Sequence, residues 1–304
     1  MAFDAFALIL GMLALGMLFA RLRMLPDSAP EVLNLVVLHV CLPAAVLIYV
    51  PRLRLDASLL ALVATPWLLM GATVALVLAC TRWLHLRRDQ HAVLLLCVGL
   101  GNTSFIGYPM VQALLGEQAL PYAVVYDQLG SFLLLSSFGL YVVAAYGGDT
   151  PPSPRAFALR MLRFPPLWAL VFAFVAMPEH PPAWIAAMLR RLSDALLPLV
   201  MLAVGLSIRL RMPHEELRPL LAGLALKLLL LPLLALGLGK AMGLHGDILH
   251  ASVLEAGMPA MVTAGALAIS HGLAPRLAAA LVGYGILLSL LSLPGWAWLL
   301  RQLS

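Results

Sequence analysis

Polar residues and helix breakers interrupt a long apolar stretch between residues 90 and 115. The interruption reads Gly101-Asn102-Thr103-Ser104-Phe105-Ile106-Gly107-Tyr108-Pro109. Glycine weakens a helix and proline removes one of its hydrogen bonds, so this segment predicts a helix in two parts. Asn102, Thr103 and Ser104 would then offer hydrogen-bonding side chains to a ligand at the break.

A second interruption lies in the apolar stretch 247–271 and reads Glu255-Ala256-Gly257-Met258-Pro259-Ala260-Met261-Val262-Thr263-Ala264-Gly265. We expect Gly257 and Pro259 to break this helix, with Pro259 in the first turn of the following half. If the two interruptions cross, half-helices starting near Pro109 and Pro259 bring together two N-termini, each with about half a positive charge. Such a pocket binds anions without a fixed cation. Two proline kinks in packed helices are the alternative, but the matching pair favours a binding site, in which Thr263 would take part.

Four ionisable candidates also lie within apolar stretches, where a charge needs a partner: Asp127, Asp194, Lys227 and Glu255. Glu255 directly precedes the second interruption, and we expect it to bind a proton or sodium or to hold the interruption together. Asp127 could cap the first interrupted helix or titrate, and Lys227 could neutralise an acidic partner or attract an anion. The oxygens of residues 102–104 could complete a site for a hard cation. The sequence leaves these alternatives open.

The remaining polar residues of the apolar stretches indicate packing at least as much as binding. Asn34 is expected to make a hydrogen bond between helices or to contact the substrate. Asp194 follows Arg190 by four residues, the spacing of an ion pair on one helix face, which predicts a surface pair. His39 and His250 are interpreted as packing or interface residues. Since no His or Cys pair has metal-ligand spacing, we expect neither a metal site nor a cofactor.

The composition shows what must position these residues. Of the 304 residues 63% are hydrophobic and 11% are charged, and the mean hydropathy is +1.00. A soluble protein of this length would expose far more polar surface, so the composition predicts a membrane protein in a lipid bilayer and excludes a soluble enzyme. The net charge of +5 comes from basic residues scattered between apolar stretches, which argues against a nucleic-acid partner. Cys41, Cys80 and Cys97 lie in apolar stretches and indicate no disulfide scaffold.

About 20 apolar residues are needed to cross a bilayer as a helix, and ten stretches of roughly this kind occur. They cover residues 3–20, 30–50, 57–81, 90–115, 119–146, 157–177, 183–208, 217–241, 247–271 and 275–300. The first stretch is followed by Arg21 and Arg23 in place of a signal cleavage site, so we expect it to be retained as a span. The loops are too short for a catalytic domain, and function must therefore lie within the helices.

Basic residues predict the orientation, because they accumulate in cytoplasmic loops. Twelve of the 19 Lys and Arg residues follow odd-numbered spans and six follow even-numbered spans. Both termini are therefore expected outside, in a multi-pass protein of the plasma (inner) membrane.

The Pro-rich segment near residue 150 divides the ten spans into five and five. We interpret residues 1–146 and 157–304 as two five-helix repeats joined by a cytoplasmic linker, 147–156. Prolines recur in matching spans, as the pairs Pro43 and Pro198, Pro66 and Pro232, and Pro109 and Pro259. Because five is odd, the second repeat must be inverted relative to the first, an arrangement typical of secondary transporters.

Two other classes of protein were weighed against a transporter. A membrane enzyme is disfavoured, because Tyr126-Asp127 lacks a Gly-x-Gly-Asp partner and neither HExxH nor GxSxG occurs. A non-transporting anion sensor would be expected to add an output domain, and the sequence ends four residues after Leu300.

Four segments together resemble the auxin efflux carrier family, whose members include bacterial malonate-type carriers and plant auxin exporters. They are GNTSFIGYP, LEAGMPAMVTAGALA, LNLVVLHVCLP with Asn34 and Pro43, and PLVMLAVGLSI after Asp194. The resemblance covers essentially the whole chain. It implies an all-α membrane protein with ten transmembrane helices in two inverted repeats, of the sodium/proton antiporter-like fold. It also implies that broken crossing helices 4 and 9 form the substrate site, in a homodimer with an elevator motion.

Two residues depart from the family pattern: Ser104 stands where the GNTGF motif has glycine, and Thr263 where members frequently carry asparagine. These departures bear on the substrate and leave the fold expectation unchanged. The sequence therefore predicts a secondary carrier of a small organic anion, such as malonate or an auxin-like acid, bound by Asn34, residues 102–104, Pro109, Gly257, Pro259 and Thr263. A sodium-coupled organic-anion symporter of bile-acid type is the alternative among transporters.

Overall fold

A computed structural model of the chain describes residues 2–53, 56–148, 164–207 and 216–303, together with Arg155, Leu159 and Leu162. These residues are almost entirely helical and form no strand. The predicted linker 147–156 lies mostly outside the described residues.

Helices occupy the described part of every predicted apolar stretch. The first half contains α1 (Ala2–Leu22), α2 (Ala29–Val36), η1 (Val37–Cys41), α3 (Leu42–Tyr49), η2 (Val50–Arg52), α4 (Ala57–Leu84), α5 (Arg88–Gly99), η3 (Thr103–Gly107), α6 (Tyr108–Leu115), η4 (Glu117–Ala119), α7 (Leu120–Tyr126), η5 (Asp127–Ser131), α8 (Phe132–Leu134), η6 (Leu135–Gly139) and α9 (Leu140–Gly147). The second half contains α11 (Pro165–Val175), α12 (Ala183–Asp194), α13 (Leu196–Ser207), α14 (Leu217–Ala225), η8 (Leu226–Leu230), α15 (Leu231–Ala241), α16 (Gly246–Ala256), α17 (Val262–Ser270) and α18 (Pro275–Leu303).

Within the described ranges, five continuous helical segments are long and apolar enough to cross a bilayer. They are Ala29–Tyr49, Ala57–Leu84, Glu117–Gly147, Leu217–Ala241 and Pro275–Leu303, and Ala7–Leu22 and Pro165–Val175 are shorter apolar helices. The chain is therefore a multi-pass helical membrane protein. The ten-span inverted repeat stays a prediction.

Three prolines of the matching pairs lie within helices, Pro109 among them although its segment was expected to break the helix. Pro43, Pro109 and Pro232 each occupy the second position of an α-helix that directly follows a π-helical turn. Those turns are η1, η3 and η8. Proline lacks an N–H and its ring collides with the carbonyl four residues earlier, so a wider turn just before it removes the clash without ending the helix.

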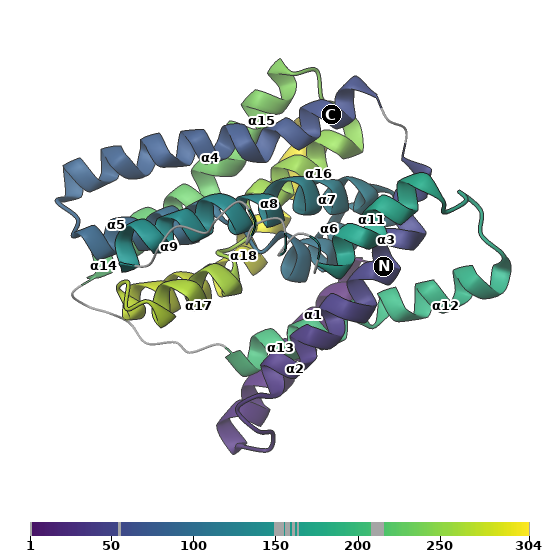
Figure 1. Ribbon diagram of the computed structural model, residues 1–304, viewed down its shortest axis with the longest axis horizontal. Coiled ribbons are helices and arrows are strands. Elements are labelled where there is room, and N and C mark those ends of the chain that lie inside the picture. Colours follow the sequence, from purple (N-terminus) through teal and green to yellow (C-terminus); the bar gives the residue numbers. More distant parts are fainter. Residues whose placement is uncertain are drawn as a thin grey trace.

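The helices pack in two bundles, each drawn from both halves of the sequence. The first contains α1, α2 and α3 with α11, α12 and α13, and α1, α2 and α13 lie together at the bottom centre of Figure 1. At the crossing of α1 and α13, Gly16 and Gly205 face each other, and a Cβ on either would overlap the other helix's backbone. The second bundle contains α4–α9 and α14–α18, with the interrupted helices packed among α4, α7, α14, α15 and α18.

Candidate functional site

The two interrupted helices cross inside the second bundle, and their broken backbones pair with each other. The N–H of Asn102 donates to the carbonyl of Pro259 at 2.8 Å, and the N–H of Met261 donates to the carbonyl of Leu100 at 2.9 Å. Gly101 and Ala260 thereby form an isolated antiparallel bridge. This pairing satisfies backbone groups that neither half-helix can satisfy, which is the requirement for irregular backbone within a membrane protein.

The expectation that the second half-helices start near Pro109 and Pro259 is wrong. The first begins at Thr103 and carries Pro109 inside it, and the second begins at Val262, three residues after Pro259. The π turn before Pro109 lets the helix start earlier. Pro259 lies outside the second half-helix because its carbonyl accepts the N–H of Asn102 from the crossing segment. Gly257 ends α16, where its N–H donates to the carbonyl of Leu254 at 3.0 Å.

Asn102 stands at the crossing with an unsatisfied side chain. Its backbone carbonyl accepts from the N–H groups of Ile106 and Gly107, whereas neither atom of its amide has a hydrogen-bond partner. The residue is only 1% exposed. Leaving a buried polar group unpaired costs about 1–3 kcal/mol, and Asn102 lines neither of the two cavities described below.

A cavity of about 300 Å³ lies on one flank of the crossing. Its polar lining is Ser104, Asp127, Ser136 and Thr263, and its apolar lining is Leu38, Phe105, Phe132, Leu135, Phe164 and Met261. Ser104 and Thr263 are each the second residue of a half-helix. The cavity therefore meets the positive ends of both half-helices, and its use as an anion site stays a prediction.

Ser136 was not anticipated as a site residue. Its hydroxyl is buried without a hydrogen-bond partner and the residue lines this cavity. The available signal was the Ser136-Ser137 pair in the apolar stretch 119–146. Ser137 donates to the Leu133 carbonyl of its own helix at 2.6 Å, so only Ser136 remains available to a ligand.

Asp127 holds the start of the first half-helix. Its carboxylate accepts from the hydroxyl of Thr103 at 2.5 Å, the hydroxyl of Tyr108 at 3.0 Å and the side-chain amide of Gln128 at 2.9 Å. These bonds join η3 and α6 to η5 through side chains, and the capping of the first interrupted helix by Asp127 stays a prediction. Tyr108 and Gln128 were missed because their contact with Asp127 depends on how the helices pack.

The charged ends of the Glu255 and Lys227 side chains lie close to two glycines of the first interruption, Gly107 and Gly101. A Cβ on Gly107 would be 2.5 and 2.7 Å from the Glu255 carboxylate oxygens, and a Cβ on Gly101 would be 3.0 Å from the Lys227 Nζ. Lys227 donates to the carbonyl of Ala256 at 3.2 Å. Both Glu255 oxygens are buried without a hydrogen-bond partner. The two glycines thus make room for a buried acid and a buried base beside the crossing.

A second, much smaller cavity of about 20 Å³ lies between these charges. Its lining includes Thr103, Lys227 and Glu255, together with Gly101 and Tyr126. This volume holds about one water molecule or small ion.

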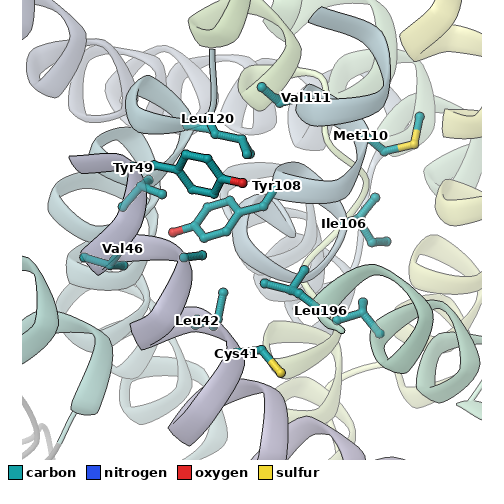
Figure 2. Packing of buried hydrophobic residues seen from close by; sticks show 14 of the residues in the cluster. Cys41, Leu42, Val46, Tyr49, Ile106, Tyr108, Met110, Val111, Leu120 and Leu196 are labelled. Carbon is teal, nitrogen blue, oxygen red and sulfur yellow. The ribbon is translucent and has the colours of Figure 1, made fainter. Parts of the chain in front are cut away.

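The buried side chains of α6, the second part of the first interrupted helix, are packed in a hydrophobic cluster. Figure 2 shows Tyr108, Met110 and Val111 of this helix in one cluster with Tyr49 of α3 and Leu196 of α13. The cluster joins the interrupted helix to the first bundle.

Other predicted residues lie apart from the two cavities. Asn34 is half-buried on α2, one turn before Leu38, which does line the larger cavity. Of the two arginines predicted to pair with Asp194, Arg190 contacts Glu117 at 3.2 Å, and the surface pair of Asp194 with Arg190 or Arg191 stays a prediction. Within the described part of the chain, no group of three His, Cys, Asp or Glu residues could hold a metal ion.

Comparison with known proteins agrees with the geometry. The sequence matches the family described as membrane transport protein over residues 1–148 and 152–297. It is 30% identical over 296 residues to an uncharacterized transporter of Methanothermobacter thermautotrophicus, with 95% of each chain covered. It is 23% identical over 306 residues to an uncharacterized transporter of Methanocaldococcus jannaschii, with 98% of each chain covered. The chain therefore belongs to the membrane transport protein family, the family of the auxin efflux carriers that its motifs resemble.

Proposed function

We propose that this protein is a secondary carrier that moves a small organic anion across the plasma membrane by alternating access. The observation that carries the proposal is the cavity of about 300 Å³ lined by Ser104 and Thr263, at the starts of the two half-helices. A carboxylate bound there would accept hydrogen bonds from these hydroxyls and from Ser136. The two helix N-termini would supply positive potential.

The lining of the cavity favours a particular kind of acid. Phe105, Phe132 and Phe164 form apolar walls, and neither Lys nor Arg occurs among the described residues that line it. Asp127 adds an acidic group. A second carboxylate, as in malonate, would have no cation to neutralise it, and burying an unpaired charge is costly. The cavity therefore supports a monocarboxylate with an apolar body, such as an auxin-like acid, better than malonate.

The small cavity bears on the coupling ion. Glu255 and the hydroxyl-bearing Thr103 provide oxygen ligands that a sodium ion could use. The Lys227 ammonium lines the same 20 Å³, and two cations in so small a volume would repel each other strongly. We therefore favour proton coupling through Glu255 or Asp127, or export driven by the membrane potential alone, over the sodium symport of the bile-acid type.

The two bundles fit an elevator motion, in which the bundle with the crossed helices would slide along the bundle of α1–α3 and α11–α13. Both termini outside, two inverted repeats and a homodimer complete this proposal.

The test is uptake of labelled acids by the purified protein in liposomes, with a proton gradient, a sodium gradient and a membrane potential imposed one at a time. We expect saturable uptake of an aromatic monocarboxylate such as indole-3-acetate, and weaker competition by malonate. Stronger competition by malonate would refute the substrate class. Saturable binding of the acid without flux under any gradient would refute transport and favour an anion sensor.

A further inference from the structure

A groove far from the crossing lies where α4 ends and α5 begins. It has a volume of about 620 Å³ and lies among α4, α5 and α9. Its lining is Leu78, Thr81, Leu86, Arg88, His91, Tyr141, Ala145 and Tyr146. Neither the proposed substrate site nor the small charged cavity shares a residue with it.

One end of the groove is cationic. Arg88 donates to the carbonyl of Ala145 at 2.8 Å, and its guanidinium carbon lies 5.3 Å from the centre of the Tyr146 ring. These contacts hold the guanidinium at the groove wall while its remaining N–H groups stay available. The neighbouring Arg87 contacts the carboxylates of Asp89 and Glu216. Among the described residues, Arg88 forms no ion pair with a carboxylate. Its positive charge could therefore pair with a bound anion.

A helix end reinforces this cationic end, and a paired histidine lies beside it. The ring Nδ1 of His91 is 2.6 Å from the hydroxyl of Thr81. Arg88 is also the first residue of the twelve-residue helix α5, whose N-terminus favours an anion.

The other end of the groove is apolar and open. Leu78 is 43% exposed and Tyr141 is 59% exposed, and both lie in segments that are long and apolar enough to cross the bilayer. A free inorganic anion would contact only the cationic end and leave this apolar rim exposed. An amphipathic anion would cover the cationic end and the apolar rim at once. At the end of α4, before the cationic end of the groove in the chain, Trp83 is 80% exposed, as expected for a residue at the membrane–water boundary.

We propose that this groove binds an anionic glycerophospholipid, with its phosphate against Arg88 and the start of α5 and one acyl chain along Leu78 and Tyr141. The lipid would link α4 and α9 to the first half of the interrupted helix. Its role would be to anchor that helix at the Arg-rich end of the bundle.

Native mass spectrometry of the purified protein with equal amounts of phosphatidylglycerol and phosphatidylcholine tests this site. We expect phosphatidylglycerol to be retained preferentially. Arg88→Gln should weaken its retention about fivefold, the effect of about 1 kcal/mol for one basic group at a lipid surface. Arg82→Gln, which removes an exposed charge from α4 outside the groove, is the matched control and should change retention less than twofold.

Three further measurements test the charge of Arg88, the apolar rim and a soluble anion as the alternative ligand. Arg88→Lys should retain part of the preference, and Leu78→Gln should weaken binding of both lipids through the apolar rim without touching the charge. Excess inorganic phosphate should leave the bound lipid in place, and displacement by phosphate would identify a site for a soluble anion instead. Equal losses for Arg82→Gln and Arg88→Gln, or no loss for either, would overturn the proposal. If Arg88→Gln does not fold, the parent's preference for phosphatidylglycerol, its partial loss in Arg88→Lys and its resistance to phosphate decide.

Discussion

At the scale of single residues, Asn102 has an amide that is buried, unpaired and adjacent to the backbone bridge between the crossed helices. Truncation of this amide removes no hydrogen bond that the described residues make. We therefore expect Asn102→Ala to keep the thermal unfolding temperature of the parent protein or raise it slightly, while transport in liposomes is lost. An Asn102→Ala variant that transports at the parent rate would remove this residue from the site.

Ser136 and Ser137 form a natural matched pair, since only Ser136 lines the larger cavity. A net hydrogen bond contributes about 0.5–1.5 kcal/mol, so Ser136→Ala should raise the KM for the transported acid by roughly two- to twelvefold. Ser137→Ala should leave KM unchanged, because its hydroxyl is bonded to its own helix. Equal effects of both substitutions would place the substrate elsewhere.

Glu255 has two alternative roles: to carry the coupled ion, or to hold the second interruption together. Glu255→Gln keeps the size of the side chain on Gly107 but removes its capacity to ionise. If Glu255 carries the coupled proton, the variant should lose the response of uptake to an imposed pH gradient. A variant that folds and keeps the parent's pH and sodium dependence would leave Glu255 with a structural role.

At the scale of helices, small residues decide how closely two elements approach. Gly16 lies against the backbone of α13, whereas Gly11 in the same helix has open space where a Cβ would be placed. Alanine in place of glycine favours the helix by about 0.5–1 kcal/mol at both positions. At Gly16 the overlap should reverse this gain and cost about 1–3 kcal/mol.

We therefore expect Gly16→Ala to lower the unfolding temperature and Gly11→Ala to maintain or raise it, measured by thermal denaturation in detergent. Similar shifts in both variants would mean that α1 and α13 do not depend on close contact.

At the scale of the whole molecule, the two bundles are joined differently at their two ends. Glu117, between α6 and α7, forms an ion pair with Arg190 of α12, across the boundary between the bundles. At the α17 end, by contrast, an apolar cavity of about 240 Å³ separates α17 and α18 from Val204 and Ser207 of α13. If the protein is a carrier, the ion pair helps to close one end while the other stays open.

Both partners of this pair are about half exposed, and exposed ion pairs contribute at most about 1 kcal/mol. Glu117→Arg and Arg190→Glu should therefore each change the transport rate by at most about fivefold, because like charges then face each other. The double exchange should restore the parent rate. A double variant as impaired as the single ones would show that the pair does not control closure.

The positions of the helices and of the breaks could be predicted from the sequence. Apolar stretches of spanning length reveal membrane helices without any long-range information, and the described part of every predicted stretch contains helix, with breaks at residues 100–102 and 257–261. The polar, Gly-containing segments around Asn102 and Gly257 likewise mark the breaks. Whether the ten stretches form an inverted repeat with both termini outside remains a prediction.

Only the tertiary structure decided where the half-helices start and which polar groups meet. Proline chemistry points to Pro109 as a helix start, yet a π turn and the hydrogen bonds to Asp127 let the helix begin at Thr103. The approach of Lys227 to Gly101, and of Glu255 to Gly107, joins residues far apart in the chain. Composition and periodicity act over a few helical turns, whereas such contacts depend on how whole helices pack, which no local pattern records.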